Sequence, residues 1–145
     1  MRRFTVLALT FAAITLLSAL AHADACAPAK VANLSVITGK TTAVLTWNDP
    51  GDDCDTGTAA SYEIRRSSGT ITDTNWQSAT VVASGSPAGA DGTPDCRDFT
   101  NLGCGQTYYY VIFFFDAAGN RSPISNLASG TQKACNTSRE VACAQ

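Results

Sequence analysis

Seven short segments in which apolar residues recur at every second position constrain the fold of this chain most. Segments 42–48 (TAVLTWN) and 61–67 (SYEIRRS) show this period of two, which is typical of a β-strand with one buried face. Clusters of Gly, Pro, Asn and Asp separate the segments, as turn residues do between strands. The pattern predicts an all-β sandwich. The expected strands are 32–38, 42–48, 61–67, 78–83, 97–102, 107–115 and 124–131.

The N-terminus has the order of a secretory signal peptide. A pair of arginines precedes an uncharged, mostly apolar stretch, 4–21, which ends in the triplet Ala21-His22-Ala23. A charged start, an apolar middle and a small-x-small end are typical of export signals. The alternative is an uncleaved membrane anchor, because roughly 18 apolar residues can just span a bilayer. We predict a signal peptide at 1–23 and no membrane span in the mature protein.

Removal of the signal peptide changes the balance of charges. The chain of 145 residues holds 10 Lys and Arg against 12 Asp and Glu, a net charge of −2. Without Arg2 and Arg3 the basic residues number 8 (10 minus 2), so the mature protein carries 8 minus 12, or −4. Such a protein offers no basic surface to a phosphate backbone, so we predict no nucleic-acid partner.

The mature protein also lacks histidine, because the single histidine, His22, lies within the predicted signal peptide. Without histidine there is no Ser-His-Asp or Cys-His nucleophile pair and no histidine-bearing zinc site. We therefore predict that the protein is not an enzyme and uses no cofactor.

Six cysteines remain after cleavage, and no two have the C-x-x-C spacing of a redox or zinc motif. An even number of cysteines in an exported chain predicts three disulfides. Six cysteines allow 15 pairings, so their number and spacing leave the pairing open. The cysteines are Cys26, Cys54, Cys96, Cys104, Cys135 and Cys143.

Four further motifs follow one another along the chain. They are Leu45-x-Trp47, Tyr62-x-Ile64, Leu102 with Tyr108 six residues later, and Asp116-x-Ala118-Gly119-Asn120-x-Ser122. Over 28–132 this order resembles a fibronectin type III domain, most closely those of bacterial secreted and surface proteins. The resemblance implies a seven-stranded immunoglobulin-like sandwich with Trp47 in its core. It also implies that Leu102 and Tyr108 form a tyrosine corner.

The resemblance further implies a pairing of the cysteines. In this topology the chain enters at the pole that carries the loop after the second strand, which brings the first two cysteines together. The next two flank a strand and its turn, which leaves the last two for each other. The implied bridges are Cys26–Cys54, Cys96–Cys104 and Cys135–Cys143.

A tail follows the domain. We expect the fibronectin type III domain to occupy 24–132 and the tail to occupy 133–145. In the tail, Thr137 and Glu140 have capping-box spacing. The spacing predicts a helical turn or two, which would cover part of the sandwich.

The segment 107–115 has two apolar faces, which is the most informative feature for function. If its even-numbered residues face inward, its odd-numbered residues face outward. An outward apolar stripe forms a contact surface for a protein or a sugar, unless the tail covers it or a domain fused in relatives has been lost and has left it bare. Both alternatives stay open at this point. The candidate binding residues are Tyr109, Val111, Phe113 and Phe115.

An acidic loop follows the second expected strand. Its carboxylates could meet Asp116 and Asn120 at one pole and hold calcium. No known calcium motif is present, and Asp-rich turns are usually solvated turns, so we predict no metal site. The weak calcium candidate consists of Asp49, Asp52, Asp53 and Asp55.

These features favour a secreted binding or adhesion module, extracellular, periplasmic or at the cell surface. Its partner would be a protein or a carbohydrate. The alternative is a structural subunit that associates with itself, as a homo-oligomer or filament, through the aromatic stripe and the sheet edges.

Overall fold

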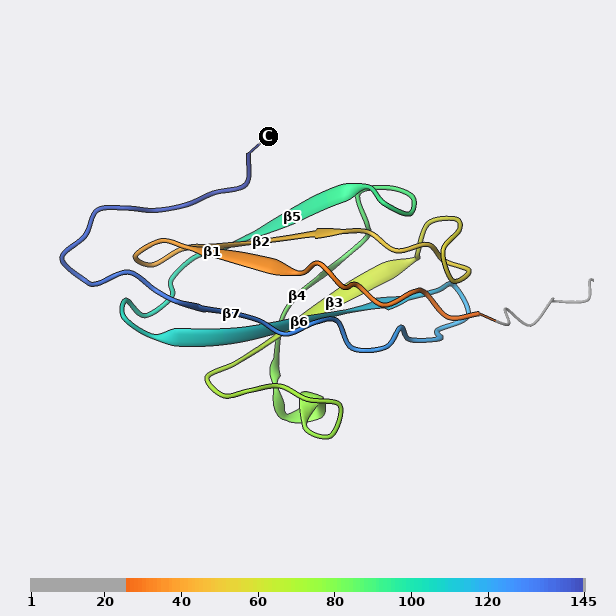
Figure 1. Ribbon diagram of the computed structural model, residues 1–145, viewed down its shortest axis with the longest axis horizontal. Coiled ribbons are helices and arrows are strands. Elements are labelled where there is room, and N and C mark those ends of the chain that lie inside the picture. The colour runs from red at the N-terminus through yellow and green to blue at the C-terminus, as the bar shows by residue number, and fades with distance from the viewer. Residues whose placement is uncertain (1–25, 145) are drawn as a thin grey trace, which may run out of the picture.

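The computed structural model describes residues 26–144 (Figure 1). The expected signal peptide, 1–23, lies outside these residues. The regular structure of the described part consists of seven strands and one turn of 3-10 helix. They are β1 (Ser35–Thr38), β2 (Ala43–Asn48), β3 (Ser61–Ser67), η1 (Trp76–Ser78), β4 (Thr80–Gly85), β5 (Pro94–Phe99), β6 (Thr107–Phe115) and β7 (Ala128–Thr131).

The strands form two sheets that face each other (Figure 1). The three-stranded sheet has the order β1-β2-β5, and the four-stranded sheet has the order β4-β3-β6-β7. Every neighbouring pair of strands is antiparallel. This arrangement confirms the predicted seven-stranded all-β sandwich.

Four strands differ clearly in extent from their expected segments. β1 begins three residues late, and β4 is shifted by two residues toward the C-terminus. β5 begins three residues early, because its ladder with β2 extends to the pair Asn48 and Pro94. β7 begins four residues late, because the chain before it pairs with β6 irregularly. The backbone N–H groups of Ser122 and Ser125 donate to carbonyl oxygens of β6. There, backbone N–H groups of β6 donate to the hydroxyl oxygens of Ser122 and Ser125.

The main core fills the space between the two sheets. Leu45, Ile64 and Phe114 are fully buried in it. Trp47 lies on β2 with its ring 5.5 Å from that of Tyr62, in an edge-on arrangement that suits aromatic rings. The expected position of Trp47 in the core is confirmed.

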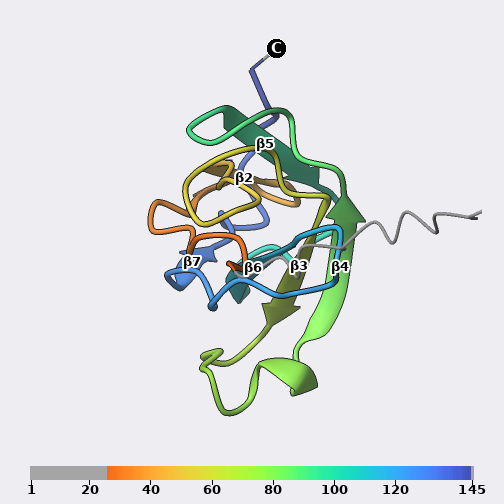
Figure 2. The same ribbon diagram turned by 90° about the vertical axis from the view of Figure 1, so that its right-hand side faces the viewer.

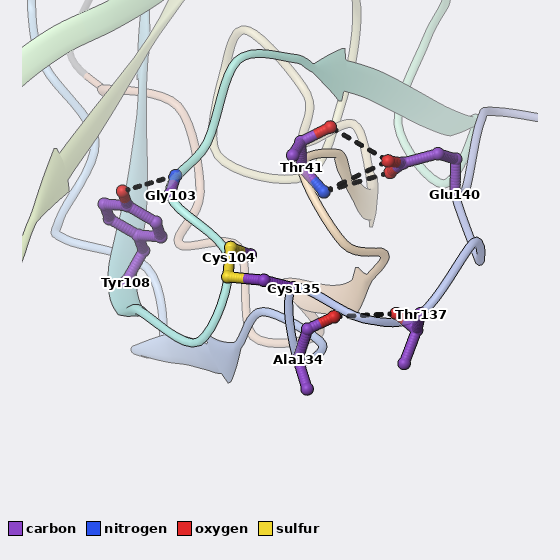
Figure 3. Close-up of a disulfide and its surroundings, with 8 residues drawn as sticks. All are labelled: Thr41, Gly103, Cys104, Tyr108, Ala134, Cys135, Thr137 and Glu140. Carbon is purple, nitrogen blue, oxygen red and sulfur yellow. Dashed lines mark hydrogen bonds between the residues drawn. A yellow bond between two sulfur atoms is a disulfide. The ribbon is translucent and has the colours of Figure 1, made fainter.

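The turn before β6 forms the expected tyrosine corner (Figure 3). The backbone N–H of Gly103 donates to the hydroxyl oxygen of Tyr108 at 3.1 Å, and Leu102 is buried beneath the turn. Asn101, just before it, adopts a left-handed conformation with φ of 58°, which asparagine tolerates better than most residues. The corner thereby fixes how the chain crosses from β5 to β6.

The three disulfides differ in part from the implied pairing. The first confirms that pairing, but the implied Cys96–Cys104 and Cys135–Cys143 bridges are wrong. Cys96 lies in the middle of β5, opposite Thr46, whereas Cys104 lies beyond the far end of β5, beside the chain that leaves β7. The bridges are Cys26–Cys54, Cys96–Cys143 and Cys104–Cys135, with Cα–Cα distances of 5.4, 6.1 and 5.2 Å.

The C-terminal tail is extended, and residues 133–144 contain no helix. The backbone N–H of Thr137 donates to the carbonyl oxygen of Ala134, which closes a single turn. The Glu140 carboxylate does not cap a helix but accepts hydrogen bonds from Thr41 in the β1–β2 turn (Figure 3). It also accepts one from the hydroxyl group of Thr42. The expected helical turn is therefore wrong, because its capping residue is engaged by a distant part of the chain.

Gly39, in the β1–β2 turn, tests how closely the tail packs there. A Cβ atom at this position would lie 2.5 Å from Thr42 Oγ1 and 2.8 Å from Glu140 Oε2. We expect Gly39→Ala to lower the free energy of unfolding by about 1–3 kcal/mol, measured by chemical denaturation.

Gly69→Ala is the matched control for this substitution. No atom lies within 4 Å of a Cβ built at Gly69, and its φ is not positive. We expect this variant to be neutral or stabilised by up to about 1 kcal/mol, because alanine restricts the unfolded chain. Equal losses in both variants would contradict the close packing of the tail at Gly39.

Candidate binding site

The aromatic stripe of β6 is covered. The odd-numbered residues face away from the main core, as the alternation requires, but Val111 and Phe113 are fully buried, with 0% of each exposed. Tyr109 and Phe115 are half-buried. Of the two alternatives left open, an exposed contact surface is therefore wrong at the two central positions. Cover by the tail is wrong as well, because the C-terminal tail does not belong to the cluster that encloses them.

The cover comes from the segment between β3 and β4, residues 68–79, together with Ile124. Ile71 packs against the stripe, and the ring of Trp76 lies 4.8 Å from that of Phe113. Figure 2 shows the segment as a long excursion that projects from the adjacent ends of β3 and β4. The outer face of β6 is thus part of a second, smaller core.

Two arginines hold this cover in place. Arg65 forms an ion pair with Glu63, and its guanidinium lies 4.7 Å from the centre of the Trp76 ring. Arg121 lies 4.4 Å from the Trp76 ring and 4.5 Å from the Phe113 ring, within the range of cation–π attraction. Arg65 Nη1 also donates to three carbonyl oxygens of the segment, those of Trp76, Gln77 and Ala79.

The acidic loop does not gather its carboxylates around a common point. Asp49 turns inward, where its carboxylate accepts hydrogen bonds from Trp47 Nε1 at 2.9 Å and from the Gly89 N–H at 3.1 Å. Burial raises the pKa of Asp49, although these hydrogen bonds oppose the rise. Asp53 and Asp55 are exposed. Within residues 26–144, no three His, Cys, Asp or Glu side chains are placed to hold a metal ion.

Asp52 lies near Asp116, so the two loops meet at one pole as expected. Burial raises the pKa of Asp52, and repulsion from the Asp53 and Asp116 carboxylates adds to the rise. Burial also acts to raise the pKa of Asp116, but hydrogen bonds from the Asn120 side chain and backbone outweigh it and lower the pKa. The Asp116 oxygens are therefore occupied in shaping their own turn.

A hollow lies elsewhere, on the outer face of the three-stranded sheet, and has a volume of about 590 Å³. We call it the groove. Its floor includes Ile37, which is 51% exposed, with Val44 and Thr46 of β2. The tail residues 141–144 form one wall. The polar rim includes Asn33, Asn48 and Asp95.

The tail wall is anchored covalently and by hydrogen bonds. The bridge between Cys96 and Cys143 ties the tail to β5, and the backbone N–H of Cys143 donates to Asp98 Oδ1 at 2.7 Å. The backbone N–H of Val141 donates to Thr42 Oγ1 at 2.8 Å. Sequence reasoning missed the groove, because the implied bridges left the tail free of the three-stranded sheet.

The groove offers apolar contact with hydrogen-bonding groups at its rim. The described residues include no histidine, and every cysteine among them is bridged. No helix within 26–144 is both long enough and apolar enough to cross a membrane.

No family model matches the sequence, and no curated protein matches it. Solved structures do. A fibronectin type III-like protein from Clostridium thermocellum is 24% identical with a TM-score of 0.52, over 77% of this chain and 99% of that one. The sixth fibronectin type III domain of a human fibronectin type III domain-containing protein is 15% identical with a TM-score of 0.55, over 76% and 90%.

Part of a larger enzyme matches as well. A β-1,2-glucanase from Parabacteroides distasonis is 19% identical with a TM-score of 0.53, over 74% of this chain. The chain spans 13% of that enzyme and 32% of a matched structure of several titin domains. Together with the tyrosine corner and the two sheets, these likenesses show that the chain has the fibronectin type III fold. The fold alone does not define a function, because one fold serves many unrelated roles.

Phe113 tests the second core. We expect Phe113→Ala to lower the free energy of unfolding by about 3–5 kcal/mol, as for other large residues in a closed core. Phe115→Ala is the control, since Phe115 lies on the same strand face but is half-buried, and we expect it to cost less than about 2 kcal/mol. Urea denaturation measures both. A small loss for Phe113→Ala would show that the outer face of β6 is not a core.

Glu140 makes the attachment of the tail dependent on pH. Hydrogen bonds from Thr42 and Thr41 lower the pKa of Glu140 below its ordinary value of 4.5. The ionised carboxylate therefore stabilises the folded state above pH 4.5, and this contribution is lost as the pH falls through the folded pKa.

We expect Glu140→Gln to remove this part of the pH dependence of stability. Thermal unfolding of both proteins at a series of pH values, with an NMR titration of the Glu140 carboxyl, measures it. Parallel stability profiles, or a carboxyl that titrates at 4.5 or above, would contradict the role of Glu140.

Proposed function

We propose that this protein is an exported, non-catalytic binding module that recognises an extended segment of a protein partner in the groove. The observation that supports this most directly is the groove itself. It joins an apolar floor, with Ile37 half-exposed, to a polar rim and a covalently anchored wall. A floor of this kind supplies apolar contact area, and rim groups orient a ligand through hydrogen bonds.

A protein partner is favoured over a carbohydrate. Sugar recognition through stacking needs an exposed aromatic ring, and Trp47, the one aromatic residue that lines the groove, is only 2% exposed. The large apolar side chains that are exposed within residues 26–144 are all aliphatic. They are Ile37, Val81 and Leu127. Aliphatic contacts suit apolar side chains of a peptide better than the faces of a sugar.

An extended segment is favoured because the chain's own tail already runs extended along the same face. Residues 141–144 lie beside the sheet without helical structure and form a wall of the groove. At the rim, Asn33 Oδ1 accepts a hydrogen bond from the Asn48 backbone, and the Asn48 side chain makes no hydrogen bond within the described residues. That amide is available to the backbone of an extended peptide.

An oxidising compartment is consistent with the disulfides. Three bridges with no free cysteine among the described residues fit an extracellular or periplasmic protein, in keeping with the predicted signal peptide at 1–23. We further propose that a binding domain occupies 24–132 and that the tail, 133–145, contributes the groove wall. In this proposal the tail is part of the binding site and not an independent unit.

Selection from a displayed library of random peptides tests the proposal. We expect binders of the oxidised protein to lose affinity at least about tenfold with Ile37→Asp, because the charge lies on the apolar floor. Leu127→Asp is the matched control, since Leu127 is an exposed aliphatic residue outside the groove. The affinity of this variant for the selected peptides should be unchanged. NMR shift changes on peptide addition should fall on the floor and on 141–144.

Other outcomes would reject the proposal. Binders that respond equally to both substitutions, or whose shift changes fall outside the groove, would place recognition elsewhere. A glycan array that yields binding sensitive to Ile37→Asp, with no peptide selected, would assign the groove to carbohydrate. Far-ultraviolet circular dichroism of each variant shows that the loss is not due to unfolding.

A further inference from the structure

The four-stranded sheet ends at β4, which has no strand on its outer side. Beyond its ladder with β3, the backbone of Thr80–Gly85 makes no hydrogen bond within residues 26–144. Val81 is 46% exposed. Figure 2 shows β4 at the margin of its sheet. Unpaired N–H and C=O groups at such an edge are a template for another strand.

In contrast, β5, an edge strand of the three-stranded sheet, is protected from pairing with another strand. Pro94 lacks an N–H, and the backbone N–H of Cys96 is occupied by the Asp95 carboxylate. Asp98 accepts a hydrogen bond from the tail, and the Cys96–Cys143 bridge ties the tail to β5. Proline, charges and a covering segment are the usual means by which proteins prevent pairing at an edge. None of these three is present on β4, whose one protective feature is a bulge in its ladder with β3.

The sequence around β4 is also uncharged. Residues 74–90 contain no Asp, Glu, Lys or Arg, although the predicted mature chain has a net charge of −4. Two copies of an acidic protein repel each other over most of their surface, so the uncharged stretch is where they can approach. The β-branched residues Thr80, Val81 and Val82 suit pairing across strands.

We propose that β4 is a self-association edge, at which a second copy of this chain pairs antiparallel to β4 about a two-fold axis. Each copy then satisfies the edge groups of the other, and the two four-stranded sheets become one. Identical strands in antiparallel register form a closed, isologous contact, which stops at the dimer. A second copy is the partner that an uncharged strand fits, because such a strand has no charge pattern to select a different protein.

A bulge limits the strength of this contact. The ladder between β3 and β4 shifts register between Ile64 and Arg65, which leaves Val82 without a partner on β3. A bulge bends and twists an edge strand, so only a short stretch on each side of Val82 can pair. The dimer is therefore weak and reversible, with a small interface.

Sedimentation equilibrium over a dilution series of the oxidised protein tests the dimer. We expect wild type to show a monomer–dimer equilibrium, and β4 amides to exchange more slowly with solvent at high protein concentration. Val81→Lys should raise the dissociation constant at least about tenfold, because it brings like charges together near the axis. Ile37→Lys is the control, since Ile37 is exposed to a similar extent but lies in the groove, and the dissociation constant of the dimer should not change.

The outcomes separate this dimer from the peptide-binding groove. A wild-type protein that stays monomeric at every concentration overturns the dimer and leaves the groove untouched. The dimer proposal is also overturned if Ile37→Lys dissociates the dimer and Val81→Lys does not. If Val81→Lys lowers the melting temperature, Thr80→Lys repeats the test on a second exposed β4 residue. Val81→Thr, which keeps the β-branched shape, should preserve both fold and dimer.

Discussion

Burial of β6 on both faces is the constraint on which the rest of the structure depends. One face packs into the main core, and the other is apolar as well, so a sandwich with two layers alone would leave it exposed. The chain meets this constraint with 68–79, a segment in which Trp76 and Ile71 are the anchors. Arg65 makes the cover stable, because it satisfies carbonyl oxygens that this irregular segment would otherwise leave unpaired.

This cover determines where a partner can bind. With the outer face of the four-stranded sheet largely closed, the outer face of the three-stranded sheet is the remaining broad surface with an apolar floor. The tail narrows that surface to a groove without filling it, since Glu140 and Cys143 hold it to one side. The two faces of the sandwich thus have different tasks. One completes the core, and the other presents Ile37 and its neighbours to solvent.

The alternation of apolar and polar residues predicted the strands. The family resemblance predicted the core position of Trp47 and the tyrosine corner. All three features depend on short sequence patterns, so the sequence alone could predict them. The burial of Phe113 could not be predicted in the same way. It depends on a mostly polar segment more than thirty residues earlier, in which Ile71 and Trp76 are the only signal. Two of the three implied disulfides were wrong for a similar reason. The partner of Cys96 depends on the path of the tail, which no periodicity reports.

The acidic residues explain why the groove and β4 stand out. The Asp49 carboxylate accepts a hydrogen bond from the Trp47 indole, the Asp116 carboxylate shapes its own turn, and the Glu140 carboxylate anchors the tail. These three carboxylates therefore hold turns and loops in place. Such groups are poor candidates for binding a cation, because their oxygens already accept hydrogen bonds. The remaining carboxylates discourage contact between acidic surfaces, which leaves the apolar floor and the uncharged edge as the proposed places of recognition. Since the groove wall is held by the Cys96–Cys143 bridge, the proposed recognition there depends on an oxidising environment, which matches the compartment that the N-terminal sequence predicts.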